Sequence, residues 1–322
     1  MTERRPSTEG VHAAASRVAP HVTRTPLLPL AWEGGRVWVK AECLQQGGSF
    51  KLRGAFNRLL QLSAEERKRG VVAFSSGNHA QGVALAARAL GIPATIVMPA
   101  DAPAVKRDAT LAAGAEIVAY DRTTESREEI GARLAADKGC VLVPSFDDVD
   151  VIEGQGSAGV EILDQLGALP DKVIVSCGGG GLAAGIALAL PGVEIVTVEP
   201  EGWDDMARSL EAGAPVPLEE PAPPTLCDAL QTKLVSPLTV AALKQAGARG
   251  VAVSEEEIKG AMAYAARHLR IVAEPGGAVA LAALLAGKAG PVSERTVVVV
   301  SGGNVDPALY AEIVAGQAAR AS

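Results

Sequence analysis

The sequence contains few cysteines, few aromatic residues and no cluster of basic residues. Among its 322 residues are four cysteines, and aromatic side chains make up 3% of the chain. Because the cysteines lie far apart without a CxxC pair, neither a zinc ribbon nor a disulfide framework is expected. The net charge of −7, with no block rich in Lys or Arg, argues against nucleic-acid binding. We therefore expect a protein that acts on small molecules in a reducing cytoplasm.

The sequence also lacks long apolar runs. No stretch approaches the ~20 consecutive apolar residues that a membrane span requires. The first ten residues, MTERRPSTEG, are polar and lack the apolar segment of a signal peptide. We therefore expect no membrane partner and no export. A chain of this length that is 48% hydrophobic and 21% charged is able to form two closely packed domains.

Short β-branched runs alternate with alanine-rich segments of helical length. This alternation is typical of βαβ units around a parallel sheet. The polar segment 121–138 predicts one more surface helix before a strand at 141–143, and the proline-rich segment 212–224 predicts a long loop. The units form two sets, which predicts two α/β domains. The first set comprises 71–74, 80–90, 94–98, 102–113 and 116–119, and the second comprises 172–175, 182–190, 194–198, 255–269 and 296–300.

A lysine stands where two glycines end and a helix is predicted to begin, in the segment GGSFKLRGA at 47–55. The positive end of a helix dipole disfavours the ammonium form of Lys51 and favours its nucleophilic free amine. Phe50, directly before it, is suited to pack on a flat ring. A solvated surface lysine is the alternative explanation of this segment taken alone.

Two further segments join a predicted strand to a predicted helix through anion-binding residues. The first, FSSGNHAQ at 74–81, offers main-chain N–H groups and hydroxyls, although a simple helix cap is the alternative. His79 lies in this segment, and on its own such a histidine is more often a structural residue than a catalytic base. In the second, VSCGGGGL at 175–182, four glycines let main-chain amides surround a phosphate, although a plain hinge is the alternative. The lysine of a nucleotide P-loop is missing, so a cofactor phosphate is predicted.

Near the C-terminus, the apolar strand 297–300 ends in SGGN at 301–304. In open α/β sheets, ligands bind beyond the carboxyl ends of the strands. We therefore expect Ser301 to face the same crevice as the other loops, whereas a simple turn is the alternative.

In this order, GSFKLRGA, SSGNHAQG, GGGGL and SGGN resemble the fold-type II enzymes that use pyridoxal 5'-phosphate (PLP), specifically the serine/threonine dehydratases and serine racemases. The resemblance extends from about residue 25 to residue 306. It implies a tryptophan synthase β-like fold with two α/β domains of twisted, mostly parallel sheets. Residues 1–70 and 148–322 would form a large PLP-binding domain, and residues 71–147 would form a small domain. The resemblance also implies a homodimer.

The resemblance assigns a role to the residues of each motif. Lys51 would form the Schiff base with PLP and remove the α-proton of the substrate. The ring would be held by Phe50, by Asn78 at its 3-oxygen, and by Ser301 at its pyridine nitrogen. The phosphate would be held by Gly178, Gly179, Gly180, Gly181 and Leu182. The carboxylate of a small amino-acid substrate would be bound by Ser75, Ser76, Asn78 and His79.

A serine hydroxyl is too weak an acid to protonate the pyridine nitrogen, so the electron sink of the cofactor is muted. Prompt loss of a β-hydroxyl suits such a site better than transamination does. The expected reaction is the conversion of L-threonine, L-serine or a similar β-hydroxy amino acid to a 2-oxo acid and ammonia.

The segment EPEGWDD at 199–205 resembles a divalent-cation site found in many of these enzymes. Glu199 and Asp205 would supply carboxylates and Trp203 its carbonyl oxygen, a set that suits Mg²⁺, Ca²⁺ or Mn²⁺ in a structural role. Solvated acidic residues after a strand are the alternative.

Substrate and outcome stay open within this group. Ser76 resembles the second base of serine racemases, so the sequence permits racemisation in addition to elimination. Arg127 matches an arginine near the substrate pocket of such enzymes and would bind a second carboxylate, which favours 3-hydroxyaspartate. A surface pairing of Arg127 with neighbouring glutamates is the other explanation. Ala229 replaces a glycine that many relatives place against the ring, which puts the substrate preference in doubt.

The sequence also argues against a regulatory domain, a sulfhydrylase activity and a protein that binds PLP without turnover. The chain ends at Ser322, so the regulatory domain of biosynthetic threonine dehydratases is not expected. Cysteine synthases carry a TSGNTG-like loop where this chain has SSGNHAQ, which argues against a sulfhydrylase. A PLP-binding protein without turnover is disfavoured because Lys51 and both substrate-facing serines are present.

Overall fold

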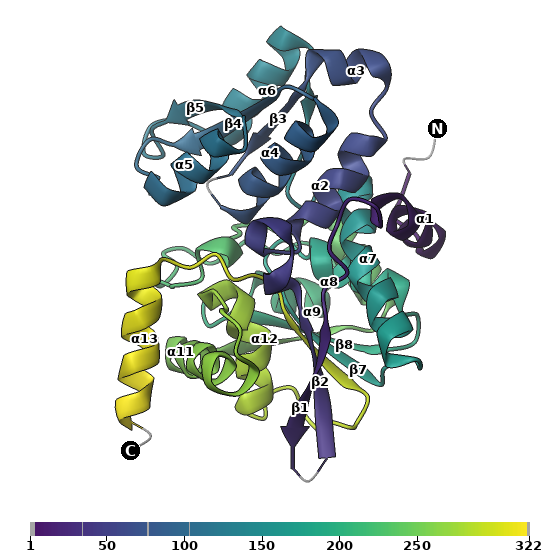
Figure 1. Cartoon of the computed structure of the whole chain (residues 1–322), viewed down its shortest axis with the longest axis vertical. Coiled ribbons are helices and arrows are strands. Elements are labelled where there is room, and N and C mark those ends of the chain that lie inside the picture. Colours follow the sequence, from purple (N-terminus) through teal and green to yellow (C-terminus); the bar gives the residue numbers. More distant parts are fainter. Residues whose placement is uncertain (1–3, 34, 76, 103, 321–322) are drawn as a thin grey trace.

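The computed structural model describes residues 4–33, 35–75, 77–102 and 104–320, which form two sheets (Figure 1). The six-stranded sheet has the order β1-β2-β10-β7-β8-β9, with β1 antiparallel to β2 and the other pairs parallel. Its strands are β1 (Leu27–Trp32), β2 (Gly35–Ala41), β7 (Lys172–Ser176), β8 (Glu194–Pro200), β9 (Arg249–Val253) and β10 (Thr296–Val300). The four-stranded sheet is parallel throughout, in the order β5-β4-β3-β6. Its strands are β3 (Val71–Phe74), β4 (Ala94–Pro99), β5 (Glu116–Tyr120) and β6 (Val141–Leu142).

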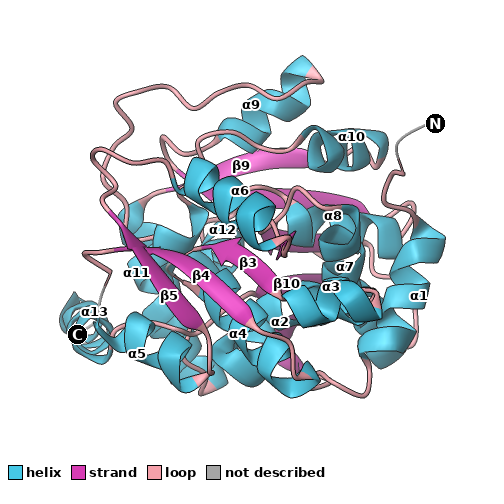
Figure 2. Ribbon diagram, turned by 90° about the horizontal axis from the view of Figure 1, so that it is seen from above, coloured by secondary structure: helices cyan, strands magenta, loops and turns pink. Residues whose placement is uncertain are grey.

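Helices cover both faces of each sheet (Figure 2). The helices of the first half are α1 (Thr8–Val18), α2 (Lys51–Leu60), α3 (Ala64–Arg69), α4 (Asn78–Leu90), α5 (Ala104–Ala112), α6 (Arg127–Lys138) and α7 (Val149–Leu166). Those of the second half are α8 (Gly181–Ala189), α9 (Asp205–Ala212), α10 (Pro237–Gln245), α11 (Glu255–Tyr264), α12 (Pro275–Leu285) and α13 (Pro307–Arg320). A π-helical turn, Ala265–Leu269, extends α11. None of the helices in the described part of the chain has the length and apolar composition of a membrane span.

The strands of the large sheet are apolar on both faces, as a sheet between two helical layers requires. In β10, Val297 and Val299 pack into the core beneath α7 and α8. Val298 and Val300 face the opposite way, into the core beneath α11 and α12. This explains why the strand reads as an uninterrupted apolar run, and it leaves the carboxyl end of β10 at the rim of the sheet.

The strands of the small sheet are also apolar on both faces, and each face packs into its own hydrophobic core. Ala73 of β3 and Ile96 of β4 pack with α2 and α4, whereas Val72 and Val97 pack beneath α6. Helix α2 also packs against α7 beside the large sheet, so the helix that begins at Lys51 contacts both halves of the molecule.

The expected α/β architecture is confirmed, including both sets of βαβ units. Helix α6 begins six residues later than the predicted segment 121–138, because Ser126 caps its N-terminus and the residues before it form a turn. The β1–β2 hairpin, α7, α10 and α12 were not anticipated. The division into domains at 70/71 and 147/148 stays a prediction.

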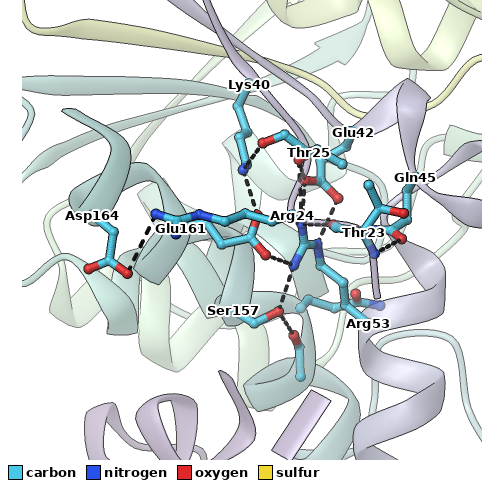
Figure 3. A network of polar contacts seen from close by, with 12 residues as sticks. Thr23, Arg24, Thr25, Lys40, Glu42, Gln45, Arg53, Ser157, Glu161 and Asp164 are labelled. Atoms are coloured by element: carbon cyan, nitrogen blue, oxygen red, sulfur yellow. Dashed lines mark hydrogen bonds and ion pairs between the residues drawn. The ribbon is translucent and has the colours of Figure 1, made fainter. Parts of the chain in front are cut away.

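A buried ion network fixes the start of α2 (Figure 3). The guanidinium of Arg53, two residues after Lys51, donates to both carboxylate oxygens of Glu42 at 2.7 and 2.8 Å. Two further N–H groups donate to Glu161 of α7, each at 2.8 Å. Lys40 of β2 joins the network through Glu161 at 2.6 Å. Because Arg53 and Glu42 are fully buried, each needs the other to compensate for lost hydration.

Candidate active site

The four predicted segments, 47–55, 74–81, 175–182 and 301–304, meet around two adjoining cavities. The larger has a volume of about 600 Å³, and its lining includes Lys51, Ser75, Asn78, His79 and Arg127. The smaller, about 80 Å³, shares Lys51 and Asn78 with it. The smaller cavity is lined by every residue predicted to hold PLP, namely Phe50, Lys51, Asn78, Gly178, Gly179, Gly180, Gly181, Leu182 and Ser301. Ser76 lies outside the described residues, so its role stays a prediction.

Lys51 is the first residue of α2, and its Nζ donates to the carbonyl oxygen of Ser145 at 3.1 Å. Burial lowers the pKa of this amine to about 8, and the nearby carboxylate of Glu274 opposes that shift. Lys51 lies at a helix N-terminus, as predicted, but the dominant cause of its lowered pKa is burial. The Nζ atom lies 5.2 Å from the centroid of the Phe50 ring.

The segment that carries Lys51 is paired with the loop after β10. The Phe50 N–H donates to the Ser301 carbonyl at 3.2 Å, and the Gly303 N–H donates to the Gly48 carbonyl at 2.9 Å. The Oγ of Ser176, at the end of β7, lies 2.9 Å from the Oγ of Ser301. These contacts hold the lysine and the serine predicted to face the ring nitrogen in a fixed relation.

The tetraglycine turn leads from β7 into α8 and has no space for a side chain at Gly179 or Gly180. Gly180 has a φ of 86°, which L-residues rarely adopt. A Cβ on Gly179 would lie 2.2 Å from the ring of Phe146, and one on Gly180 would lie 2.5 Å from Met206. The glycines line the smaller cavity at the start of a helix, where anions are favoured.

Asn78 and His79 open α4 and are both buried. The Nε2 of His79 lies 2.8 Å from the carbonyl oxygen of Val143, so Nε2 carries the hydrogen. Its Nδ1 has no hydrogen-bond partner among the described residues, and burial, aided by Lys51, lowers the pKa of the ring to about 3. A neutral ring with a bare acceptor would not attract a carboxylate. If His79 contacts the substrate carboxylate, the main-chain N–H is the group suited to do so.

Arg127 begins α6 at the wall of the larger cavity. Its guanidinium lies 5.7 Å from the centroid of the Phe74 ring, and its Nε donates to Glu128 at 2.8 Å. Arg127 therefore pairs with a glutamate on its own helix and also lines the cavity, while its binding of a second carboxylate stays a prediction.

The three residues predicted to hold a cation lie around the start of α9. Both carboxylate oxygens of Glu199 accept main-chain hydrogen bonds, from Met206 and Ala207, each at 2.9 Å. Neither carboxylate oxygen of the buried Asp205 has a hydrogen-bond partner among the described residues. Burial raises the pKa of Asp205 to about 7 and that of Glu199 well above its usual value. The indole Nε1 of Trp203 donates to the Pro223 carbonyl at 2.8 Å.

Several residues of the site were not singled out from the sequence. Glu274 and Phe146 line both cavities, and Asn304, inside the quoted SGGN motif, received no role. Across the described residues, no group of three or more His, Cys, Asp or Glu side chains is arranged to hold a metal. The predicted cation site has only two carboxylates and a main-chain carbonyl, so it falls outside that class of site.

The model of the family described as "Pyridoxal-phosphate dependent enzyme" matches residues 18–303. The chain belongs to this family. The PLP enzyme is 44% identical over 311 residues to an L-threo-3-hydroxyaspartate ammonia-lyase of Pseudomonas sp, covering 94% of this chain and 97% of that protein. It is 37% identical over 317 residues to the serine racemase of Schizosaccharomyces pombe, covering 96% and 97%.

Solved structures of related PLP enzymes have the same fold. Maize serine racemase superimposes with a TM-score of 0.89 at 34% identity, covering 99% of this chain and 100% of that one. A threonine deaminase from T.th. gives a TM-score of 0.86 at 41% identity, covering 94% and 99%. The fold is that of the fold-type II PLP enzymes, and the chain is an enzyme that uses PLP, as the motifs indicated.

Proposed function

We propose that this enzyme eliminates water from a β-hydroxy amino acid to give a 2-oxo acid and ammonia, with L-threo-3-hydroxyaspartate as its preferred substrate. The observation that carries the proposal is the composition of the cavities. The amine of Lys51 lies where both cavities meet, the tetraglycine turn and Ser301 line the smaller one, and Arg127 lines the larger one.

PLP, when bound, supplies an electron sink that makes the α-proton of an amino acid acidic. The residues present fit this group. The glycine turn offers main-chain N–H groups to a phosphate, and a side chain at Gly179 or Gly180 would collide with Phe146 or Met206. Lys51 offers an amine whose lowered pKa raises the fraction of the nucleophilic form.

Lys51 would also act as the base that receives the α-proton. Its Nζ is buried in the site and donates a hydrogen bond to the carbonyl of Ser145, which accepts and does not compete for a proton. An amine with a pKa of about 8 changes protonation state easily near neutral pH, which suits a group that takes up and releases a proton in one cycle.

Ser301 supports elimination over transamination. It is 4% exposed, and its hydroxyl is hydrogen-bonded to that of Ser176. A pair of neutral hydroxyls offers no acidic group to the ring nitrogen, so the sink stays weak and the β-hydroxyl must leave promptly.

Arg127 supports a substrate with two carboxylates. Its planar guanidinium retains N–H groups beyond the one used on Glu128, and these suit bidentate binding of a carboxylate. Loss of water from 3-hydroxyaspartate, followed by hydrolysis of the resulting enamine, yields oxaloacetate and ammonia. Two relatives with the name L-threo-3-hydroxyaspartate ammonia-lyase are 41% and 44% identical to this chain, which supports the same substrate here.

We further propose that Glu199, the Trp203 carbonyl and Asp205 bind a divalent cation that stabilises the fold. The buried carboxylate of Asp205, without a hydrogen-bond partner among the described residues, supports this site, because an uncompensated buried carboxylate is costly. The racemase activity that depends on Ser76, the homodimer and the cytoplasmic location stay predictions.

A substrate panel tests the proposal. Formation of 2-oxo acid is measured with L-threo-3-hydroxyaspartate, L-threonine, L-serine and D-serine, and the recovered amino acid is checked for chirality. Arg127→Met should lower kcat/KM for 3-hydroxyaspartate about 10–100-fold, the effect of a lost charged hydrogen bond, and should affect L-serine much less. Arg122→Met, at another exposed arginine paired with an acid, is the matched control. Equal losses with both substrates would contradict the assignment of Arg127.

A further inference from the structure

A chain of side-chain amides joins the Lys51 segment to the start of α12. The Nδ2 of Asn304 donates to the Gly47 carbonyl at 2.7 Å and to the Oδ1 of Asn78 at 2.8 Å. The Nδ2 of Asn78 donates in turn to the Oε1 of Glu274 at 2.6 Å. Segments that are distant in the sequence are thus linked through two side-chain amides, the partly buried Asn304 and the buried Asn78.

The direction of every hydrogen bond in this chain follows from its first acceptor. The Gly47 carbonyl can only accept, so the Asn304 atom that faces it is the NH₂ group. That group therefore also faces Asn78, whose nearer atom is then the amide oxygen. The NH₂ of Asn78 consequently points to the carboxylate of Glu274, which can only accept when ionised. The carbonyl at one end and the carboxylate at the other select the same orientation of both amides.

This orientation leaves one N–H of Asn78 available. Its first N–H donates to Glu274, and its second has no acceptor among the described residues. Asn78 lines the smaller cavity with Lys51, so the second N–H is available to a ligand oxygen there. If the amide were reversed, its oxygen would face the carboxylate of Glu274 and the donor would be lost.

Glu274 also places a negative charge beside Lys51. It is 4% exposed, its main-chain N–H donates to the Gly302 carbonyl at 3.0 Å, and it lines both cavities. A Cβ on Gly302 would lie 2.0 Å from the Oε1 of Glu274, so a glycine is required for the carboxylate to reach Asn78.

We propose that Asn304 and Glu274 are positioning residues for the cofactor: together they hold Asn78 with one N–H available to the ring oxygen, and Glu274 keeps a carboxylate beside the nitrogen of Lys51. The proposal rests on the roles of Lys51 and Asn78 in the proposed function. It adds two residues that need not touch the substrate.

The charged surroundings of Lys51 point to Glu274 as the group that favours its protonated form. The carboxylate of Glu274 raises the pKa of Lys51 against the effect of burial. His79 is neutral because burial lowers its pKa to about 3. The other charged groups that line the larger cavity are Arg127, Glu128, Asp147, Asp228 and Lys233.

The first test separates orientation from packing at Asn304, using the dissociation constant of PLP measured by absorbance of the holoenzyme on dilution. Asn304→Asp nearly preserves the size of the side chain but places oxygen atoms against the Gly47 carbonyl and the Asn78 amide oxygen. We expect Asn304→Asp to weaken PLP binding about 10–100-fold, and Asn304→Ala about tenfold or less. A residue that acts only by filling space would show the reverse order, and that result would overturn the proposal.

The second test isolates the charge of Glu274 by titrating the absorbance band of the bound cofactor with pH. Glu274→Gln preserves an acceptor for Asn78 and removes the charge, so the pH midpoint of the band should fall by about one unit. Glu274→Asp retains the charge but withdraws it by one methylene, so the midpoint should change less while PLP binds more weakly. Glu257→Gln, a carboxylate at the N-terminus of α11, is the matched control and should leave both values unchanged.

Two results distinguish failure of this proposal from failure of the proposed function. If the wild-type band appears and is lost in Lys51→Ala, but the midpoint is the same in Glu274→Gln, the positioning role of Glu274 is wrong. If Lys51→Ala retains the wild-type band, the assignment of Lys51 itself is wrong. Circular dichroism of each variant shows whether it is folded, and the Asp and Gln variants keep the test decisive if an alanine variant unfolds.

Discussion

The hydroxyls of Ser176 and Ser301 lie 2.9 Å apart, with Ser176 as the donor. They stand at the carboxyl ends of β7 and β10, which are neighbouring strands of the large sheet. With its oxygen occupied by Ser176, the Ser301 hydroxyl keeps its own hydrogen to offer to another acceptor. The pair therefore fixes the donor that is predicted to face the ring nitrogen.

Removing Ser176 should weaken cofactor binding without removing any predicted contact to PLP. In Ser176→Ala the Ser301 hydroxyl loses the hydrogen bond that orients it, so the dissociation constant of PLP should rise about three- to tenfold, the value of one neutral hydrogen bond. Ser301→Ala should cost at least as much. Dilution followed by absorbance measures both, with the exposed Ser293→Ala as control. Unchanged binding in Ser176→Ala would show that Ser301 needs no orientation.

Uptake of PLP by the apoprotein should depend on pH through Lys51. The free amine is the reactive form, and burial lowers the pKa of Lys51 to about 8. The uptake rate should therefore rise about tenfold from pH 6 to pH 7, reach half of its maximum near pH 8 and become constant above about pH 9. Stopped-flow absorbance at a fixed PLP concentration measures the rate, and Lys51→Arg should take up none covalently. A rate that continues to rise toward pH 10 would indicate a lysine with an ordinary pKa.

A divalent cation should stabilise the protein through Asp205. The buried carboxylate lacks a hydrogen-bond partner among the described residues, so a cation that binds the folded state alone should stabilise it by about 2.7 kcal/mol at 100 times its Kd. The thermal midpoint should fall with EDTA and recover with Mg²⁺, Ca²⁺ or Mn²⁺. Asp205→Asn should abolish this response and Asp171→Asn, at the surface, should retain it. The same response in both variants would place the cation elsewhere.

The sequence was sufficient to locate the loops of this site because each joins a strand to a helix with residues whose chemistry is local. Glycines before Lys51 and the run Gly178 to Gly181 mark main-chain turns irrespective of the rest of the fold. Glu274 carries no such signal. A glutamate before a proline suggests a helix start, and its approach to Asn78 depends on how α12 packs against the loop after β10.

Hydrogen bonds between residues that are distant in the sequence could not be predicted either. Asn304 lies in a recognised motif, yet its hydrogen bonds to Gly47, Asn78 and Gln81 require that residues 47, 78 and 81 lie beside it in space. His79 was expected to bind a carboxylate, and only its contact with the Val143 carbonyl shows which ring nitrogen carries hydrogen. Long-range pairing of this kind has no periodicity to predict it.

Breaking the buried ion network should be more damaging than any surface substitution. Arg53→Met would leave Glu42 fully buried without its partner, at a cost of about 3–5 kcal/mol in the free energy of unfolding. The double variant Glu42→Gln/Arg53→Met removes both charges and should regain part of that loss. Urea unfolding followed by circular dichroism measures both, and Lys68→Met, an exposed lysine paired with Glu65, should change stability by less than about 0.5 kcal/mol. If Arg53→Met were no more destabilising than Lys68→Met, the network would not hold the start of α2. The position of Lys51 would then depend only on the hydrogen bonds between residues 48–50 and the loop after β10.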